Sequence, residues 1–269
     1  MARFRRNKHF MTQQNTAVQG GRVVLVTGAA KRIGKAIALS FASAGWRVAI
    51  HYGSSEADAN DTLKELLALG VDAMTLQGNL SDEPETRALI PTVMARFGRI
   101  DAVVNNASRF EFDDVHSFQY SNLAAHMAAN LAAPLVLAQA LHDALHEGDE
   151  GVVVNLLDQK LYNLNPDFLS YTMTKAGLAA ATVMLAKALA PKVRVVGVAP
   201  GLTLASYLQD DASFSKAHQV SVLNRSSDLQ DIAATILFAA TNRSITGSTI
   251  LVDGGQHLLA LPRDISFMP

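Results

Sequence analysis

Tyr171 and Lys175 have the residue types and the spacing of an acid–base pair. They are four residues apart in a stretch of helical pattern, so their side chains share one face of the predicted helix. A phenol with an ordinary pKa near 10 exchanges its proton poorly at neutral pH. A nearby ammonium would favour the phenolate, and lowering the pKa by about two units requires roughly 2.7 kcal/mol of differential stabilisation. For this spacing alone, a surface pair without catalytic function is the alternative.

A glycine-bearing turn joins the first predicted strand to the first predicted helix, with the sequence Thr27-Gly28-Ala29-Ala30-Lys31-Arg32-Ile33-Gly34. Gly28 permits the tight turn, and Gly34 lets the helix pack closely on the sheet. The unpaired N–H groups and the partial positive charge at the start of the helix suit a pyrophosphate. The placement between a strand and a helix predicts a dinucleotide-binding turn, although isolated glycine patterns also occur in ordinary turns.

The end of the second predicted strand indicates which dinucleotide is bound. It reads His51-Tyr52-Gly53-Ser54-Ser55, and no Asp or Glu occurs there before Glu56. An acidic residue at this place would bind a ribose 2′-hydroxyl and repel a 2′-phosphate. Arg32, together with Ser54 and Ser55, would instead suit a phosphate. We therefore expect NADPH rather than NADH, with a polar loop that binds nothing as the alternative, and we expect backbone groups to satisfy His51.

Short runs rich in valine, isoleucine and leucine alternate with longer alanine- and leucine-rich stretches of helical spacing. The predicted strands are Arg22–Val26, Arg47–Tyr52, Asp72–Gln77, Ala102–Asn105, Gly151–Leu156, Val193–Val198 and Thr249–Val252. The predicted helices are Ile33–Ala44, Glu56–Leu69, Glu85–Arg96, Ser121–His146, Tyr171–Ala190 and Asp228–Ala239. Strands with little internal polarity are buried on both faces. The alternation predicts one α/β domain, a doubly wound parallel sheet of Rossmann type with helices on both faces. The polar stretch Thr203–Asn224 would lie beyond the carboxyl edge of a strand, where ligands bind.

The composition of the 269-residue chain excludes several classes of protein. Lys+Arg numbers 23 and Asp+Glu 24, so a net charge of -1 makes nucleic acid an unexpected partner. The absence of cysteine excludes disulfides, thiolate metal sites and a cysteine nucleophile. No uninterrupted apolar run reaches the roughly 18–20 residues that cross a bilayer. We expect a soluble, cytoplasmic protein with no membrane partner, in which residues 21–269 form the domain. Residues 1–20 begin with a small basic cluster and then turn polar, and we expect a loose extension, with a basic arm that binds a partner as the alternative.

His142 and His146 are four residues apart and could both face a zinc ion. No third ligand accompanies them, and the neighbouring Glu147–Glu150 stretch has the pattern of a solvated loop. We therefore expect no metal site.

Several motifs, taken in order, resemble the short-chain dehydrogenase/reductase family. They are the turn Thr27–Gly34, Asn105-Asn106-Ala107, Tyr171–Lys175, Pro200-Gly201 and Val252–Gly255, and the resemblance covers Arg22 to Gly255. It implies that Asn130 supports a proton-relay water near Lys175 and that the long helices pair across subunits into a homotetramer. The implied cofactor-binding residues are Gly28, Arg32, Ile33, Gly34, His51, Tyr52, Ser54, Ser55, Asn79, Leu80, Asn106, Ala107, Tyr171, Lys175, Pro200 and Gly201, with Asn79-Leu80 standing where the family usually has Asp-Leu.

One departure from the family is Asp158, which stands where a catalytic serine usually precedes the tyrosine by about thirteen residues. A serine hydroxyl donates to a carbonyl oxygen that becomes negative as hydride arrives, whereas a carboxylate would repel that oxygen. Two like charges about 4 Å apart repel by ~4 kcal/mol at an effective dielectric constant of about 20. Either Asp158 is protonated, or the reduced group is not a ketone. A C=N bond fits, since its nitrogen gains a proton as hydride adds to carbon, and Asp158 would raise the proton affinity of Tyr171.

Pteridine reductases, a branch of this family, have this Asp-then-Tyr-x-x-x-Lys arrangement, and their Asn-Asn-Ala-Ser-x-Phe segment is similar to Asn105–Phe110. The resemblance implies that Phe110 stacks on a pterin lying over the nicotinamide, with Ser108 and Arg32 at the pterin edge. The implied substrate-binding residues are Arg32, Ser108, Phe110, Asp158 and Tyr171, and the implied catalytic residues are Asp158, Tyr171, Lys175 and Asn130. A basic residue often occupies the position of Ser54 in those reductases.

The leading functional hypothesis is an NADPH-dependent reductase of a pterin-type substrate, namely dihydrobiopterin, dihydromonapterin or dihydrofolate. Tyr171 would donate the proton, Lys175 would tune Tyr171 and bind the nicotinamide ribose, and Asp158 would partner Tyr171. One alternative is a carbonyl or 3-oxoacyl thioester reductase of the same family. Another is an NADP(H)-binding sensor without turnover, against which the intact Tyr171 and Lys175 pair speaks.

Overall fold

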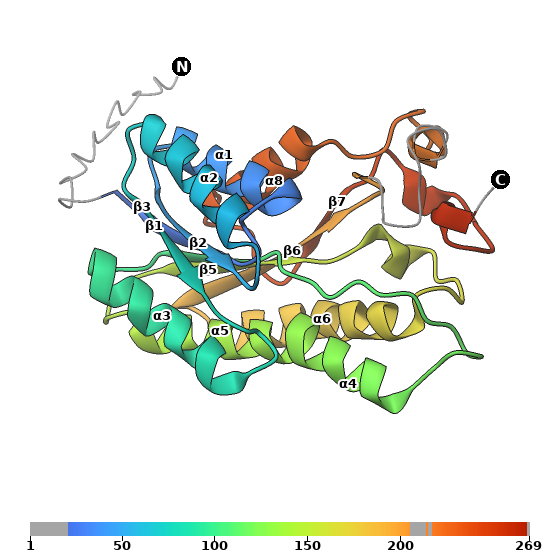
Figure 1. Cartoon of the computed structure of the whole chain (residues 1–269), viewed down its shortest axis with the longest axis horizontal. Coiled ribbons are helices and arrows are strands. Elements are labelled where there is room, and N and C mark those ends of the chain that lie inside the picture. The colour runs from blue at the N-terminus through green and yellow to red at the C-terminus, as the bar shows by residue number, and fades with distance from the viewer. Residues whose placement is uncertain (1–20, 205–213, 215–216, 268–269) are drawn as a thin grey trace, which may run out of the picture.

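The computed structural model describes residues 21–204, 214 and 217–267. The predicted extension (residues 1–20) lies outside the described residues, as do residues 205–213, 215 and 216 of the predicted loop Thr203–Asn224. The described chain forms a parallel sheet between two layers of helices (Figure 1). The predicted doubly wound α/β architecture of Rossmann type is confirmed.

Within the described residues the sheet has seven parallel strands in the order β3-β2-β1-β4-β5-β6-β7. The strands are β1 (Val23–Val26), β2 (Arg47–Tyr52), β3 (Ala73–Gln77), β4 (Ala102–Asn105), β5 (Gly151–Leu156), β6 (Val193–Pro200) and β7 (Thr249–Val252). The strand order reverses between the neighbours β1 and β4. The loops that leave these two strands diverge to opposite faces, and ligands of such sheets bind in the crevice between them.

The first strand is buried on both faces, which explains its uniformly apolar sequence. Val24 and Val26 pack in the core cluster on one side of the sheet, whereas Val23 and Leu25 pack in the cluster on the other side. Successive side chains of a strand point to opposite faces. A polar residue at any of these four positions would therefore be buried in a core. The sequence of β1 accordingly lacks the alternation of polar and apolar residues that is typical of a half-exposed strand.

Helices cover both faces of the sheet. They are α1 (Arg32–Ser43), α2 (Glu56–Ala68), α3 (Glu83–Phe97), α4 (Tyr120–Met127), α5 (Ala133–Ala144), α6 (Leu169–Ala188) and α8 (Leu229–Thr241). Helices α1, α2 and α8 lie on one face, and α3, α4, α5 and α6 lie on the other (Figure 1). Each predicted helix agrees with the structure to within two residues at both ends, except for the predicted helix Ser121–His146.

The predicted helix Ser121–His146 is divided into α4 and α5 by a π-helical turn, Ala128–Ala132. Pro134 is the second residue of α5, which begins immediately after this turn. Proline has no N–H, so the bond that residue 134 of a regular helix would donate to the carbonyl of Asn130 is missing. The ladder is interrupted there, and the π-helical turn buries the Asn130 side chain.

The segment Tyr120–Ala144 is as long and as apolar as a membrane-spanning helix. In this structure, however, Leu137 and Leu141 are fully buried in the core beneath the sheet. Helix α5 also packs against α3, and the π-helical turn packs against α6. The segment is part of one helical layer of the α/β domain.

The chain returns to the carboxyl edge of the sheet after β7. A C-terminal tail with 3₁₀ turns at Gln256–Leu258 and Ile265–Phe267 lies at this edge. The first of these turns contacts the 3₁₀ turn Gln159–Tyr162 that follows β5 (Figure 1). The tail is therefore placed next to the segment that leads from β5 to α6.

We predict that Gly34→Ala destabilises the protein because a Cβ at this position has no space. It would lie 2.8 Å from the Ala29 Cα and closer still to the Gly28 carbonyl oxygen, and backbone atoms cannot move aside cheaply. We expect a loss of about 2–3 kcal/mol, or a fall in Tm of roughly 5–10 °C, in a thermal melt. Gly53→Ala is the matched control, since nothing lies within 4 Å of its Cβ position, and its Tm should stay near that of the parent. Equal melting of the two variants would contradict the packing argument.

Candidate functional site

The glycine turn after β1 is tied to the end of β4 by side-chain hydrogen bonds. The Thr27 hydroxyl accepts from the backbone N–H groups of Asn106 and Ala107, both at 3.0 Å. The Asn106 amide donates to the carbonyls of Thr27 at 2.8 Å and Gly28 at 3.1 Å. Gly28 has a φ of 62°, a conformation that favours glycine. These bonds fix the turn at the point where the strand order reverses.

His51 connects the ends of β1, β2 and β3. Its Nδ1 accepts from the Gly28 N–H at 3.1 Å, and its Nε2 lies 3.0 Å from the Gly78 carbonyl oxygen. This pairing requires a neutral ring with the hydrogen on Nε2. Burial lowers the pKa of His51, although the Gly78 carbonyl acts in the opposite direction. Both ring nitrogens are used by the backbone, so His51 holds the turn and does not face a ligand.

The other predicted cofactor residues lie along the carboxyl edge of the sheet with different exposures. Arg32 and Ser54 are exposed, Ser55 precedes α2, and Tyr52 and Gly34 are buried. Asn79 is exposed and its side chain accepts from the Ser81 N–H, while Leu80 packs against the core on the side of α3. The remaining members are Ile33, which is partly buried, and Pro200 and Gly201, at the end of β6.

The Gly201 backbone is held in place by neighbours from the C-terminal part of the chain. Its N–H donates to the Ser227 hydroxyl at 2.8 Å, and the N–H of Leu202 donates to the Gln256 amide oxygen at 3.0 Å. A Cβ on Gly201 would lie 2.5 Å from the Ser226 hydroxyl oxygen. This edge of the crevice is therefore close-packed up to residue 202.

Asp158 and Tyr171 lie together, as the sequence argument required. The Tyr171 hydroxyl donates to Asp158 Oδ2 at 2.7 Å, and the backbone N–H of Lys160 donates to Asp158 Oδ1 at 2.8 Å. Burial raises the pKa of Asp158 above its ordinary value, although both hydrogen bonds and the charge of Lys175 act to lower it. Asp158 is therefore a better proton acceptor than an exposed aspartate.

The pKa of Tyr171 moves in the direction opposite to the one predicted from its spacing to Lys175. Burial raises it well above 10, and the charge of Asp158 and the hydrogen bond to Asp158 raise it further. Lys175 Nζ lies 5.6 Å from the centre of the Tyr171 ring and donates to the Leu156 carbonyl at 2.8 Å. In the protein alone, burial and Asp158 outweigh the ammonium. Tyr171 is therefore protonated at neutral pH, which is the form that can donate.

Asn130 holds a loop rather than contacting Lys175. Its side-chain oxygen accepts from the Arg109 N–H at 2.7 Å, and its amide donates to the Arg109 carbonyl at 2.9 Å and the Thr174 hydroxyl at 3.2 Å. The two bonds to Arg109 clamp the segment that follows β4, and the third ties Asn130 to α6. Through Arg109, Asn130 fixes the position of the adjacent Phe110.

Phe110 lies beside the Asp158–Tyr171 pair. Its ring stacks on Phe168 with centroids 4.3 Å apart and meets the Tyr171 ring edge-on at 4.8 Å. Phe110 is 36% exposed, so one ring face is covered by Phe168 while part of the side chain faces solvent. The neighbouring Ser108 is also exposed. The arrangement offers an aromatic surface next to two oxygens that are joined by a hydrogen bond.

Asp113, in the segment that follows β4, is a buried carboxylate that holds the start of α6. Asp113 is 2% exposed, and its Oδ1 accepts from the Ser170 N–H at 2.9 Å. Its carboxylate also bonds the Ser170 hydroxyl and the Asn122 amide. A carboxylate at the first turn of α6 satisfies an otherwise unpaired N–H and complements the helix dipole. Asp113 thus positions the start of the helix that carries Tyr171.

Phe168 and the C-terminal tail were not predicted from the sequence as parts of the site. Phe168 precedes α6 with a φ of 54°, and its ring is fully buried against Phe110. Arg263 and Asp264 reach the same region from the tail, where they bond Asp167 and Lys160. No local motif marks these residues, because their partners are about a hundred positions away in the chain.

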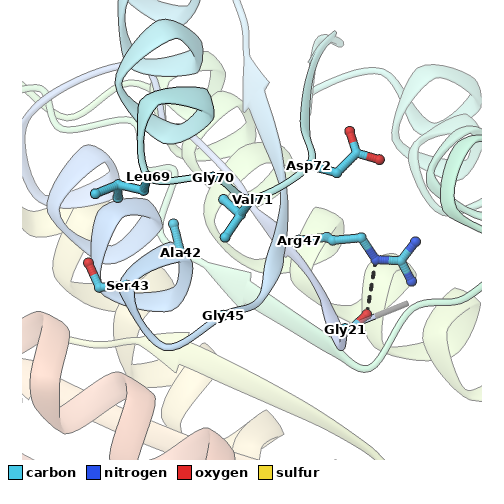
Figure 2. A pocket seen from close by; sticks show the side chains of 9 residues that line it. All are labelled: Gly21, Ala42, Ser43, Gly45, Arg47, Leu69, Gly70, Val71 and Asp72. Carbon is cyan, nitrogen blue, oxygen red and sulfur yellow. Dashed lines mark hydrogen bonds between the residues drawn. The ribbon is translucent and has the colours of Figure 1, made fainter. Parts of the chain in front are cut away.

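A separate hollow of about 640 Å³ lies at the amino edge of the sheet (Figure 2). Its wall consists of Gly21, Ala42, Ser43, Gly45, Arg47, Leu69, Gly70, Val71 and Asp72. Arg47 donates to the Gly21 carbonyl at 3.0 Å, as Figure 2 shows, and also to the Phe97 carbonyl. None of the predicted site residues lines this hollow, and its charged groups are already bonded to the protein.

Comparisons with known proteins identify relatives along most of the chain. Residues 22–215 match the family model described as short chain dehydrogenase. A 3-oxoacyl-[acyl-carrier-protein] reductase of Staphylococcus aureus is 32% identical over 251 residues, which cover 87% of this chain and 97% of the relative. A 3-oxoacyl-[acyl-carrier-protein] reductase of Synechocystis is also 32% identical, over 238 residues that cover 87% and 96%.

Solved structures give similar relatives. The crystal structure of the alternative dihydrofolate reductase 1 of Brucella canis, complexed with NADP, is 39% identical with a TM-score of 0.83 and covers 88% of this chain and 95% of that chain. A short chain dehydrogenase from Burkholderia cenocepacia in complex with NADP is 29% identical with a TM-score of 0.82, covering 88% and 98%.

The buried ammonium of Lys175 gives a prediction about stability. Burial lowers its pKa to about 8 from 10.5, although the charge of Asp158 acts the other way. Between these two pH values the unfolded chain binds the extra proton, so folding stability rises with pH. Relative to Lys175→Met, the parent protein should gain about 2 kcal/mol between pH 7 and pH 9.5 in urea unfolding. Lys187→Met, at an exposed position of the same helix, is the control and should show no such pH-dependent difference. A constant difference for Lys175→Met would contradict the lowered pKa.

Proposed function

This chain belongs to the short-chain dehydrogenase family, and on that premise we propose that it uses NADPH to reduce a pterin-type substrate: dihydrobiopterin, dihydromonapterin or dihydrofolate. It is an NADP(H)-dependent oxidoreductase, as the family and its NADP-bound structural relatives indicate. The pterin assignment is supported by one observation above all, the hydrogen bond of 2.7 Å between Tyr171 and Asp158.

The residues at the carboxyl edge fit NADPH. The turn at Gly28 has a positive φ, and Gly34 leaves no room for a Cβ, so backbone N–H groups at the start of α1 can approach a pyrophosphate. Exposed Arg32 and Ser54 lie where a 2′-phosphate would be received, and no carboxylate ends β2. Bound NADPH supplies the hydride. In this proposal the buried Lys175 binds the nicotinamide ribose.

The Asp158–Tyr171 pair can protonate a nitrogen as hydride reaches the adjacent carbon. The electron pair of the C=N bond moves to nitrogen, which takes the Tyr171 proton, and a proton from solvent, taken up directly or through Asp158, then restores the phenol. An alkoxide beside Asp158 would instead meet a like charge, at a cost of ~4 kcal/mol for a separation of about 4 Å. A raised pKa at Asp158 eases this conflict without removing it. The pair therefore favours reduction of C=N over C=O.

The aromatic wall supports a flat substrate. Phe110 is 36% exposed, so part of its ring can contact a planar ligand, and its centroid lies 4.8 Å from that of the Tyr171 ring. A planar ligand stacked there would be held at a defined distance from the proton donor. Ser108 and Arg32 are both exposed and could bind its polar edge.

Reduction of a carbonyl or a 3-oxoacyl thioester is the second candidate function. Curated relatives with that activity in their names are 32% identical to this chain. Asp158 argues against this reading, because the developing oxyanion needs a hydroxyl donor. A sensor that binds NADP(H) without turnover is the third candidate, and the presence of both Tyr171 and Lys175 argues against it.

Association into a homotetramer is also proposed. Side chains of α4, α5 and α6 leave apolar area exposed, namely Met127, Leu135, Met173, Val183 and Met184. Exposed apolar groups on adjacent helices are typical of subunit interfaces.

A substrate panel tests the proposed function. NADPH oxidation should be rapid with dihydrobiopterin, dihydromonapterin or dihydrofolate and slow with acetoacetyl thioester. Tyr171→Phe should lose at least about a hundredfold in kcat with every substrate and keep its NADPH affinity, because only the proton donor is removed. Turnover of the thioester alone would exclude the pterin assignment, and cofactor binding without turnover would support the sensor.

Asp158→Ser tests the charge argument. The variant replaces a carboxylate with a hydroxyl donor, so kcat/KM for a ketone or thioester should rise relative to that for the pterin, by roughly a hundredfold in the ratio. Asp158→Asn removes the charge but keeps the shape, and it should give an intermediate ratio. An unchanged ratio in both variants would refute the role assigned to the carboxylate.

A further inference from the structure

The C-terminal tail is attached to the segment between β5 and α6 by an ion pair between the half-exposed Arg263 and the buried Asp167. Arg263 Nε lies 2.8 Å from Asp167 Oδ2, and its terminal nitrogen lies 2.7 Å from Oδ1. The backbone N–H of Asp264 adds a third bond to Asp167, at 2.7 Å. The Asp167 side chain is only 2% exposed, so this carboxylate is committed to the tail. The tail thus has a fixed place beside the proposed active site.

Lys160 joins the tail to the proton-donating pair. Its buried Nζ donates to Asp264 Oδ2 at 2.8 Å and to the side chain of Asn165. Its backbone N–H donates to Asp158 Oδ1 at 2.8 Å, the oxygen that Tyr171 does not use. One residue therefore contacts Asp158 through its backbone and Asp264 through its side chain. A displacement of the Lys160–Asp264 pair would be transmitted to Asp158 through two hydrogen bonds.

The tail also extends the aromatic wall. The Phe267 ring lies 6.0 Å from that of Phe168 and 5.2 Å from that of Phe112, centroid to centroid. Phe168 in turn stacks on Phe110, which borders Tyr171. Polar and apolar contacts of the tail therefore converge on the two residues that flank the site, Asp158 and Phe110.

We propose that Lys160 and Asp264 are positioning residues for the reductive step, and that their ion pair orients Asp158 and balances the charge around it. The proposal rests on the proposed function in one respect, namely that Asp158 and Tyr171 deliver the proton. The two residues act through Asp158 and have no direct contact with the reacting atoms.

The charges around Asp158 come from three elements. Tyr171 and Lys175 face it from α6, Lys160 lies in the turn that follows it, and Asp264 approaches from the tail. Asp167 and Arg263 neutralise each other next to Asp264. Burial is the main cause of the raised pKa of Asp158, and the negative charge of Asp264 adds to it. The positive charge of Lys160 opposes that of Asp264.

The two substitutions should therefore move the titration of Asp158 in opposite directions. Asp264→Asn removes a negative charge and leaves Lys160 uncompensated, so the pKa of Asp158 should fall by roughly half a unit or more. Lys160→Met leaves the carboxylate of Asp264 uncompensated, so the pKa should rise by a similar amount. Asp264→Glu restores the charge and should restore the titration of the parent protein.

The experiment combines a titration with kinetics on the full-length protein. Side-chain carboxyl carbons of aspartate are labelled with ¹³C, and the Asp158 signal is identified by its absence in Asp158→Asn. The pH profile of kcat/KM with NADPH and a dihydropterin is recorded in parallel. In both Asp264→Asn and Lys160→Met we expect kcat to fall roughly tenfold with little change in KM, because the orientation of Asp158 changes and substrate contacts do not. Glu150→Gln and Arg243→Met, which break an exposed ion pair at the amino edge, are matched controls.

Opposite displacements of the Asp158 titration with loss of kcat would support the proposal, whereas displacements in one direction or none would overturn it. If Lys160→Met fails to fold, as judged by near-UV circular dichroism, the Asp158 titrations of Asp264→Asn and Asp264→Glu are compared instead. A titration that is displaced in Asp264→Asn and restored in Asp264→Glu supports the proposal, and equal titrations overturn it. Displaced titrations with unchanged rates would support the coupling of the ion pair to Asp158 and would count instead against Asp158 in the proposed function. Failure of the positioning role is thereby distinguished from failure of the proposed function.

Discussion

The hydrogen bond from the Tyr171 hydroxyl to Asp158 is the interaction on which the site depends. It joins two segments that the chain places independently, the end of β5 and the first turn of α6. Asp113 holds the start of α6, the Lys160 amide holds the other oxygen of Asp158, and Lys175 is anchored to the Leu156 carbonyl. Each of these contacts reduces the freedom of one partner, so the bond between the two side chains forms without further ordering.

Burial explains why this bond is useful in chemistry and not only in structure. In water the pKa values of a carboxyl group and a phenol differ by about six pH units. In this protein burial raises the pKa of both Asp158 and Tyr171. The phenol keeps its proton, and the carboxylate beside it makes negative charge on a neighbouring substrate atom unfavourable. The ammonium of Lys175, whose pKa is lowered by burial, can lose its charge near pH 8. Burial thus moves the titrations of Asp158 and Lys175 toward neutral pH and keeps Tyr171 in its protonated form.

Sequence patterns predicted the sheet well and the catalytic surroundings less well. Strands β2, β4, β5 and β7 have the predicted ends, because each is a short run rich in apolar residues. Nearly all residues of β2, β4 and β5 are buried, which requires such a run, whereas those of β7 are half-buried. The π-helical turn was not predicted, although the sequence contains Pro134, since an amphipathic pattern continues across the turn. The pKa direction of Tyr171 was wrong because spacing reveals the nearby ammonium but not the extent of burial. Asp167 and Arg263 could not be paired from sequence, since ion pairs between residues 96 positions apart carry no periodic signal.

The two ends of the described chain differ in their relation to the site. The first strand begins at the amino edge of the sheet, whereas the tail through Phe267 is bonded to the turn that holds Asp158. An affinity tag or fluorescent fusion attached close to Phe267 would therefore lie near the turn that holds Asp158. The same addition in front of β1 would emerge on the far side of the sheet. The position of a fusion partner therefore determines how closely it approaches the turn that holds Asp158.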